Sequence, residues 1–485
     1  MTKPRVLFIA SLAASIAGCA VGPNYKTPAL PPAAGYGVAD QPAEVGPQLV
    51  SGMAVAHDWW RAFGSDDLND LVDEALKHNP TIDQARATLR AAREATKAQR
   101  GAYFPSIEAS IQPTREQFAK DLASPTESGQ SLYTLTTSQV SVSYTPDVFG
   151  ANRRAVENLA ALEEAQRFEL EAARQTIAAN VVLAAIQDAA LRAQVAAAKT
   201  VIDDQRRTLE SFRRQHDLGQ TSKADLAAQT ALLAQAETTL PPLEKAFEIN
   251  RDLLASLVGR TPGEPVAATF TLDALTLPDA LPLSLPGDLV RQRPDVRAAE
   301  AQLHAASAAI GVAVAARLPN INLAAAAGSA PLDVGISLAN SATFWSLAGT
   351  LTQPIFEGGT LLHHERGARA EFEAAAAQYR ATVIAAFQNT ADTVHALRAD
   401  AKGSLAAQSS ADASDRSLAI ARRQLGLGDV SILTVLTAEQ ADAQARLALA
   451  QTRAAQYSDA VALFQALGGG WWNAPAGASG EKTKP

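Results

Sequence analysis

The stretch NVVLAAIQDAALRAQVAAAK (residues 180–199) lies inside a longer segment, 151–216, that contains neither Gly nor Pro. A helix over this segment would be ~100 Å long at about 1.5 Å per residue. Few globular cores can cover such a helix, so its length predicts a coiled coil or a tube of helices. Gly219 predicts a sharp turn, after which a second helix returns from residue 221. Pro241-Pro242 predicts a kink or a restart in that second helix.

The chain repeats this plan, because five landmarks recur in the same order. The pairs are Asn79-Pro80 and Arg293-Pro294, Phe104-Pro105 and Leu318-Pro319, DVFGANRRA (147–155) and PIFEGGTLL (354–362), LGQTSKADL (218–226) and LGDVSILTV (427–435), and SLVGR (256–260) and ALGGG (466–470). They predict a duplicated unit of about 210 residues. We assign the first repeat to 57–260 and the second to 288–470, joined by a proline-rich segment over 261–287. Gly428 marks the second turn.

Each repeat contains two segments that alternate as half-exposed strands do, within 106–149 and 320–356. A first helix precedes each of them, over 80–103 and 294–317. Four strands of about 10 residues are long enough to cross an outer membrane. They cannot close a barrel, because the smallest known barrels have eight strands.

An open sheet edge in lipid would leave backbone N–H and C=O groups without partners. If the four strands enter a membrane, other copies of the chain must therefore complete the barrel. The alternative is a soluble lipoprotein whose two hairpins cap a coiled coil.

The N-terminus, MTKPRVLFIASLAASIAGC, has a short positive region followed by an apolar run that is too short to span a bilayer. This pattern predicts a secretory signal peptide over 1–18. Ile16-Ala17-Gly18-Cys19 resembles the lipobox of bacterial lipoproteins, which implies that Cys19 carries a covalent lipid. Ala20 after the cysteine implies sorting to the outer membrane. We interpret 19–56 as a lipidated N-terminus with an extended linker, and 471–485 as a disordered tail.

Composition argues against several classes of function. The net charge of −8 and the pI of about 5.5 argue against nucleic acid as a partner. A single cysteine excludes an intrachain disulfide framework. No GxSxG, Walker A or HExxH motif occurs, and no residues have structural zinc spacing. We therefore predict no enzyme activity, no cofactor apart from the lipid, and no metal.

The landmarks together resemble the TolC-like outer-membrane factors, in particular the NodT-type lipoproteins of RND efflux systems. The similar pieces span the mature chain. They are CAVGPNYKTP (19–28), WWRAFGSDDLNDLVDEALKHNPTIDQARA (59–87), FPSI (104–107), YTPDVFGANRRAVE (144–157), RPDVRAAEAQL (293–303), LPNINL (318–323), LTQPIFEGG (351–359) and ALGGGW (466–471).

The resemblance implies a mainly α fold with a membrane β-barrel portion. Three copies would form a 12-stranded β-barrel and a long periplasmic α-helical barrel in the outer membrane of a Gram-negative bacterium. The implied function is the outer-membrane channel of a tripartite efflux system. It would export small toxic compounds or drugs from an inner-membrane RND pump through a periplasmic adaptor. Two alternatives stay open: an exit duct for a type I (ABC) secretion system, and a non-channel coiled-coil envelope lipoprotein.

The resemblance places the two turns at the periplasmic tip, where family members narrow the tube. Many members carry acidic residues at the positions of Thr434 and Thr437 and a tyrosine near Leu425, so this chain departs from the pattern. Its acidic candidates are Asp225 and Asp429, and Leu433 or Leu436 is a candidate apolar constriction. Because of these differences, the family's cation selectivity and the hydrogen bonds that usually close its periplasmic gate are not carried over to this chain. The alternative is that these are ordinary tip or seam residues.

Overall fold

The computed structural model describes residues 20–29, 45–117, 119, 131–284, 286–332 and 342–474. The predicted signal peptide and Cys19 lie outside these residues. The chain divides into two compact units, to which both repeats contribute. Unit 1 comprises Met1–Pro28, Leu89–Ala165 and Ala299–Tyr379, and unit 2 comprises Ala29–Thr88, Gln166–Ala298 and Arg380–Pro485.

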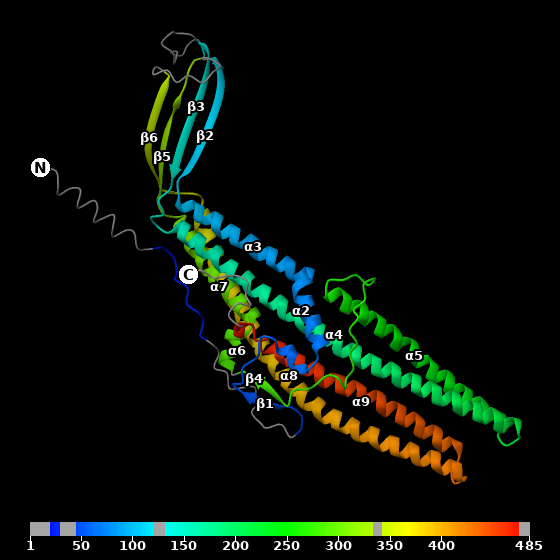
Figure 1. Cartoon of the computed structure of the whole chain (residues 1–485). Coiled ribbons are helices and arrows are strands. Elements are labelled where there is room, and N and C mark those ends of the chain that lie inside the picture. Colours follow the sequence, from blue (N-terminus) through cyan, green and yellow to red (C-terminus); the bar gives the residue numbers. More distant parts are fainter. Residues whose placement is uncertain are drawn as a thin grey trace. The chain divides into compact units, whose positions relative to one another are not determined.

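Two pairs of long helices follow the predicted plan (Figure 1). The helix predicted over 151–216 is confirmed. The predicted turns contain Gly219 and Gly428, whose φ angles of 73° and 79° favour glycine. The pairs are α4 (Ala151–Asp217) with α5 (Lys223–Leu257), and α8 (Thr360–Leu427) with α9 (Ile432–Ala466). The shorter helices are α2 (Asp66–His78), α3 (Pro80–Arg100), α6 (Pro286–Gln292) and α7 (Pro294–Ala315).

α5 continues through Pro241-Pro242, so the predicted restart is wrong. Each proline removes one N–H donor and leaves the carbonyl one turn earlier without its helical partner. Those carbonyls belong to Glu237 and Thr238, which are exposed. Water can therefore satisfy them, and the helix tolerates the pair.

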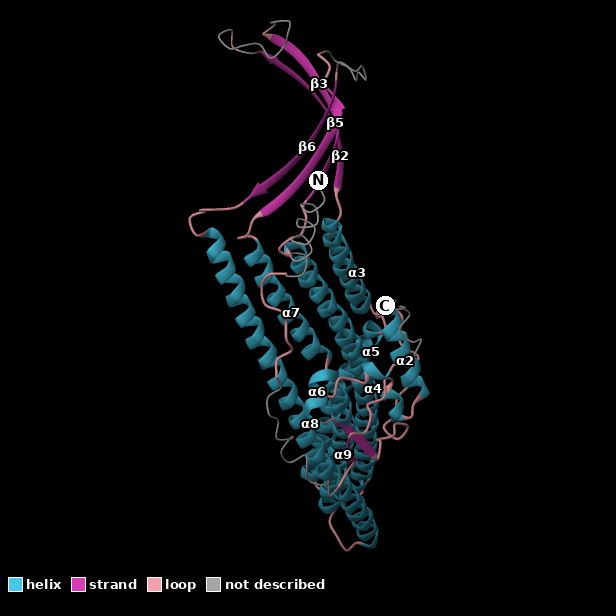
Figure 2. Ribbon diagram, turned by 90° about the vertical axis from the view of Figure 1, so that its left-hand side faces the viewer, coloured by secondary structure: helices cyan, strands magenta, loops and turns pink. Residues whose placement is uncertain are grey.

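The four predicted strands form one antiparallel sheet in unit 1 (Figure 2). The spatial order is β2-β3-β5-β6, so β3 and β5 join the two repeats at the centre. β2 and β6 are the two edges. The bounds are β2 (Ser106–Gln117), β3 (Leu132–Tyr144), β5 (Asn320–Ser329) and β6 (Thr343–Thr352). β3 and β6 end earlier than the predicted segments, and the residues after them lead into α4 and α8.

The duplication is visible in unit 2 as one hydrogen bond that occurs at equivalent positions of both repeats. Asn79 Nδ2 donates to the Leu257 carbonyl oxygen at 2.7 Å, and Arg293 Nη1 donates to the Ala466 carbonyl oxygen at 2.9 Å. Each contact ties the start of a first helix to the end of a returning helix. The donors are the two residues that precede the landmark prolines.

The structural offset between the repeats is 214 for the first helix and strand, and 209 for the rest of each repeat. The hairpin ladders begin at Ser106↔Ser143 and Asn320↔Thr352, and α4 and α8 begin 209 residues apart. Gly150 and Gly359 share a positive φ at this offset. The sequence alignment of DVFGANRRA with PIFEGGTLL is therefore shifted by two residues. It matched the shared phenylalanine, whereas the structure aligns the two strand-to-helix connections by their equal length.

Both predicted linkers contain a strand. β1 (Gln48–Ser51) pairs in parallel with β4 (Ala280–Leu283), beginning at Gln48↔Ala280. Leu281 is fully buried. The prediction of a wholly extended linker over 19–56 is wrong here, because the partner strand lies far away in the sequence and local pattern cannot reveal it.

The predicted disordered tail begins too early. Trp471–Asn473 form the short 3-10 helix η4. The indole of Trp471 donates to the Gln292 carbonyl oxygen at 2.7 Å, and Asn473 Nδ2 donates to the Val55 carbonyl oxygen at 2.7 Å. These long-range bonds hold the segment in place, and residues from 475 onward lie outside the described chain.

Unit 2 has an aromatic core around the 3-10 helix η2 (Trp59–Phe63). The ring of Trp59 stacks on Phe464 with centroids 5.1 Å apart, and Phe63 is fully buried. The Tyr457 hydroxyl donates to the Leu275 carbonyl oxygen at 2.8 Å. Several aromatic residues thus pack together in this part of unit 2.

We expect Gly259→Ala to lower the free energy of unfolding more than Gly219→Ala. Both glycines have a left-handed φ, of 80° and 73°, which costs an alanine about 1 kcal/mol. Only at Gly259 would the new Cβ also meet the His78 carbonyl oxygen, at 2.5 Å. Thermal and denaturant unfolding followed by circular dichroism compares the two variants. Equal losses would contradict this account of the helix-end contact.

Candidate channel surfaces

The sheet has one apolar face. Side chains alternate along each strand, and the three ladders bring apolar residues of all four strands to the same side. Trp345, Leu347 and Leu351 on β6 are 80%, 77% and 67% exposed. A contiguous apolar surface of this kind needs a non-aqueous partner. Its members include Ile107, Ile111, Val140, Val142, Leu323, Ala325, Trp345, Leu347 and Leu351.

The other face is polar. Ser143 Oγ donates to Asn322 Oδ1 at 3.2 Å across β3 and β5, and the Tyr133 hydroxyl donates to Glu116 at 3.0 Å across β2 and β3. Hydroxyls and amides line most of this face, which suits water rather than lipid. Its members include Ser106, Glu108, Ser110, Gln112, Gln139, Ser141, Asn320, Asn322, Thr350 and Thr352.

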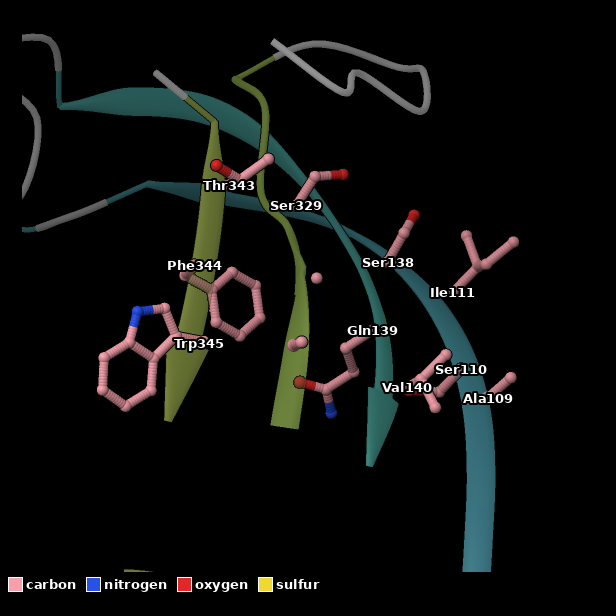
Figure 3. Close-up of a pocket in the computed structure, with 12 residues that line it drawn as sticks. Ala109, Ser110, Ile111, Ser138, Gln139, Val140, Ser329, Thr343, Phe344 and Trp345 are labelled. Atoms are coloured by element: carbon pink, nitrogen blue, oxygen red, sulfur yellow. The ribbon is translucent and has the colours of Figure 1, made fainter. Parts of the chain in front are cut away.

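A hollow on the sheet shows both kinds of side chain (Figure 3). Phe344 and Trp345 are neighbours on β6 and point to opposite sides of the strand, so Trp345 lies on the apolar face and Phe344 is an aromatic residue on the mainly polar one. Gln139 and Val140 alternate in the same way on β3. The sheet can therefore separate an apolar medium from a polar one.

The first tip turn is held by side-chain hydrogen bonds. The backbone N–H of Asp225 donates to Ser222 Oγ at 3.1 Å, and the backbone N–H of Ser222 donates to Asp225 Oδ2 at 3.4 Å. This reciprocal pair is a capping box at the start of α5. Asp225, a candidate acidic tip residue, therefore has a structural role. The Ser-x-x-acid spacing in the sequence was a signal for it.

The second tip turn lacks this arrangement. Ser431 caps α9 without a side-chain hydrogen bond to the backbone. Thr434 stands where Asp225 stands in the first repeat, and its Oγ1 lies 3.3 Å from Ser431 Oγ. A hydroxyl cannot reach back as a carboxylate does. The start of α9 therefore has fewer bonds than the start of α5.

The structure separates the other tip candidates. Leu436 is only 6% exposed and lies in the core, so it cannot form the predicted apolar constriction. The helical period turns its side chain into the seam between helices. Leu425 packs against a small cluster of Leu418, Ala421 and Val435. Asp429, Leu433, Thr434 and Thr437 are exposed and remain available to a partner or a lumen.

Two tip residues escaped the sequence analysis. Leu218 and Leu427 directly precede the two tip glycines, at corresponding positions of the repeats, and are 74% and 69% exposed. Their signal was the shared Leu-Gly at the beginning of LGQTSKADL and LGDVSILTV. Each turn thus presents an apolar side chain.

An arginine links the two helix pairs near the tips. Arg422 on α8 donates to Asp204 of α4 at 2.8 Å and to Glu439 of α9 at 3.0 Å. Burial raises the pKa of the Glu439 carboxyl, and neighbouring Asp204 adds to the effect, while Arg422 opposes it. Asp204 is therefore part of an ion-pair network between helices rather than an isolated surface charge.

A second pair of charged groups faces each other between α8 and α9. Burial, then the charge of Asp400 and a hydrogen bond to it, raise the pKa of Asp459 to about 7. The Asp459 carboxyl therefore keeps its proton up to near-neutral pH. Separation in sequence hid this pair.

The residues that follow Cys19 are docked in unit 1. The Val21 N–H donates to the Phe149 carbonyl oxygen at 3.1 Å. The buried guanidinium of Arg154 donates to the Val21 carbonyl oxygen at 3.0 Å and to Asn24 Oδ1 at 2.7 Å. Ala20 lies against Gly150, where the chain passes from β3 to α4. This part of the predicted linker is extended, but it is not free.

Tyr25 and α7 complete the docking site. The Tyr25 ring stacks on His304 with centroids 4.4 Å apart, and His304 Nε2 lies 3.0 Å from Glu157. Burial opposes ionisation of Glu157, but hydrogen bonds from His304 and Arg154 outweigh it and lower the pKa. Gly22 also lies against Gly311, where a Cβ would not fit.

Within the described ranges no group of three or more His, Cys, Asp or Glu side chains has the geometry to hold a metal ion. The features described above are a two-faced sheet, two exposed turns and ion pairs between helices. This arrangement suits passage of a solute along a polar surface.

Comparison with known proteins agrees with this description. The family model of the outer membrane efflux proteins matches the chain twice, over residues 71–260 and 285–469. The chain is 30% identical to the toluene efflux pump outer membrane protein TtgC of Pseudomonas putida, covering 97% of this chain and 96% of the relative. It is 27% identical to the pyoverdine export outer membrane protein OpmQ of Pseudomonas putida, over 97% and 98% of the two chains.

Solved structures are similar over most of the chain. The outer-membrane channel OprN matches with a TM-score of 0.85 and 27% identity, covering 93% of this chain and 100% of that one. The outer membrane channel MtrE of Neisseria gonorrhoeae, solved in its open state, matches with a TM-score of 0.82 and 25% identity, over 93% and 99%.

We expect Thr434→Asp to stabilise the start of α9 by about 0.5–1 kcal/mol. The new carboxylate would stand at the third helical position and complete a capping box with Ser431, as Asp225 does with Ser222. Amide hydrogen exchange in the first turn of α9 measures the effect. Asp225→Thr is the matched control and should speed exchange at the start of α5. Unchanged exchange in both variants would contradict the capping argument.

We expect Asp459→Asn to reduce the loss of stability between about pH 4 and pH 7. The folded pKa of about 7 lies above the ordinary value near 4, so the native state holds the proton longer. Stability therefore falls as pH rises through this window. The effect is on the order of 1 kcal/mol, because solvent screens the half-exposed pair. Melting temperatures across the pH range test this, with exposed Asp273→Asn as the control, and parallel pH curves for Asp459→Asn and wild type would refute it.

Proposed function

The chain belongs to the outer membrane efflux protein family, and on that basis we propose that it is a homotrimeric exit duct for small organic compounds. It would work with a periplasmic adaptor and an inner-membrane RND pump. The observation that carries the proposal is the two-faced sheet with two open edges. A surface that is apolar on one side and polar on the other is what the wall of a membrane pore requires.

The open edges support a homotrimer. Backbone groups of β2 and β6 have no partner strand on their outer sides in the described sheet. In lipid such groups cost several kcal/mol each, so the edges must pair. Four strands are too few for a barrel, whereas three copies supply twelve.

Exposed apolar side chains at the tips support docking of an adaptor. Leu218 and Leu427 lie at the two turns, and Leu433 on α9 is 67% exposed. Apolar side chains that cluster on an otherwise polar surface mark interaction sites. A homotrimer would carry Leu218 and Leu427 three times each, which suits a partner of matching symmetry.

The neutral residues that are exposed at the start of α9, after Asp429 of the turn, support organic cargo. Leu433, Thr434 and Thr437 are exposed and carry no charge, and the Thr437 hydroxyl donates back to the Leu433 carbonyl oxygen at 2.9 Å. Such groups do not concentrate cations. The names of the relatives, toluene efflux and pyoverdine export, indicate organic compounds for those proteins.

A lipid on Cys19 supports localisation at the outer membrane. Ala20 is docked at the junction of β3 and α4, next to the sheet. One extended residue spans about 3.5 Å, so an acyl group on the preceding cysteine would enter the bilayer beside the sheet. The lipid then anchors the chain and is no part of the pathway.

The test is retention of a small amphipathic fluorescent dye in energised cells with and without the protein. Loss of the protein should raise retention, because the pump then has no exit across the outer membrane. Cys19→Ala should leave partial export, since the sheet still spans the membrane. Unchanged retention for several dyes and toxic compounds would overturn drug efflux and favour secretion, which a comparison of secreted proteins would then detect.

Leu218→Asp combined with Leu427→Asp tests the docking of the adaptor. The double variant should raise dye retention toward that of cells without the protein, while its amount in the outer membrane stays normal. Met53→Asp, which alters another exposed apolar residue away from the tips, is the control. Full export by the tip variant would remove these leucines from the docking surface.

A further inference from the structure

Two segments that pack together at the centre of the sheet have counterparts in the other repeat, and these counterparts are exposed at the two edges of the same sheet. In unit 1, residues 145–149 between β3 and α4 line one cavity with Leu318-Pro319, which precede β5. β3 pairs with β5 from Tyr144↔Leu323 to Ser138↔Ser329. The end of the first hairpin therefore packs beside the beginning of the second.

The corresponding halves lie apart. Residues 354–358 after β6 correspond to 145–149, and Phe104-Pro105 before β2 corresponds to Leu318-Pro319. Ile355, Phe356 and Phe104 are 89%, 87% and 73% exposed, whereas Leu318 is half-buried. The two surfaces that are equivalent to the internal contact are therefore both exposed and do not meet within one chain.

We propose that the next copy of the chain completes this contact in a defined register. The inference rests on the proposed homotrimer. β6 of one copy pairs with β2 of the next, so that Thr352 lies opposite Ser110 and Trp345 lies opposite Gln117. This register is the β3–β5 ladder carried over by the repeat offsets of 209 and 214. Ile355 and Phe356 then pack against Phe104 of the neighbouring copy.

An equivalent donor and acceptor in the two repeats support this register. Inside the chain the Ser143 hydroxyl donates to Asn322 Oδ1 at 3.2 Å. The repeat offsets replace this pair by Thr352 and Glu108, another hydroxyl and another side-chain oxygen. The Thr352 hydroxyl of one copy can therefore donate to the Glu108 carboxylate of the next. A charged acceptor strengthens such a bond.

The two faces of the sheet also agree. In this register Leu351 lies opposite Ile111 and Thr350 lies opposite Gln112, so apolar residues meet apolar residues and polar residues meet polar ones. A slip of one residue would exchange the faces. A slip of two would keep the faces. In one direction it would separate Thr352 from Glu108, and in the other it would place them directly opposite, so crosslinking must distinguish these registers. The contact joins different surfaces of two copies, and such a head-to-tail interface generates a ring if the rotation closes.

Disulfide crosslinking tests the register. The chain has one native cysteine, Cys19, so added pairs report on themselves. We expect Thr350→Cys with Gln112→Cys to form covalent trimers after mild oxidation in outer membranes. Ser141→Cys with Ala326→Cys is the matched control, because it is the corresponding pair within one chain and should form an internal bond.

Two further cysteine pairs, each displaced by two residues from the expected register, test whether crosslinking is specific for that register. Thr350→Cys with Ser110→Cys, and Thr350→Cys with Thr114→Cys, should each give about tenfold less trimer, because Cα atoms more than about 7 Å apart rarely form disulfides. Native mass spectrometry measures the oligomer independently of crosslinking.

Covalent trimers from the expected pair alone would support the inference. Trimers from a slipped pair would overturn the register and leave the homotrimer standing. A trimeric mass with only the internal control bond would overturn the pairing of β6 with β2. A monomeric mass would overturn the proposed homotrimer itself.

Discussion

Backbone hydrogen bonding at two open sheet edges is the constraint on which the rest of the architecture depends. β2 and β6 each present a row of N–H and C=O groups, and the sheet carries a broad apolar face beside them. In water such edges can be tolerated, but in lipid every backbone group needs a partner. An apolar face of this breadth suits a membrane, and in a membrane the two edges need further strands. The proposed homotrimer rests on these two facts together rather than on any single contact.

Internal duplication lets one set of contacts serve several places. The bond from Asn79 to the Leu257 carbonyl oxygen and the bond from Arg293 to the Ala466 carbonyl oxygen fix the helix ends in the same way, although the donors differ chemically. The repeats differ where they meet something outside themselves. At the tips one turn has a capping box and the other does not. At the sheet, one junction is covered inside the chain and the corresponding one is exposed.

Charged contacts between the alanine-rich helices, some of them buried, help to define how the helices pack. Alanine seams allow close approach but specify register poorly, because the side chains are small and alike. Asp188 on α4 is fully buried and lies 3.3 Å from Arg192 and 3.6 Å from Arg251 of α5. Arg422 connects α8 with both α4 and α9. Removing one partner of such a pair leaves an uncompensated charge, so these bonds act against slippage of the helices.

The sequence by itself determined the elements that depend on local pattern. Freedom from Gly and Pro predicted α4, alternation predicted the strands, and recurring landmarks predicted two repeats, to which the family model assigns 71–260 and 285–469. The tip glycines were correct for the same reason, since a left-handed φ is a property of one residue. Pairings between distant segments were not predictable in this way. Only the tertiary structure decided the strand pair β1–β4, the docking of Ala20 and Val21, the burial of Leu436 and the raised pKa of Asp459. Each depends on a partner whose distance in sequence carries no local signal.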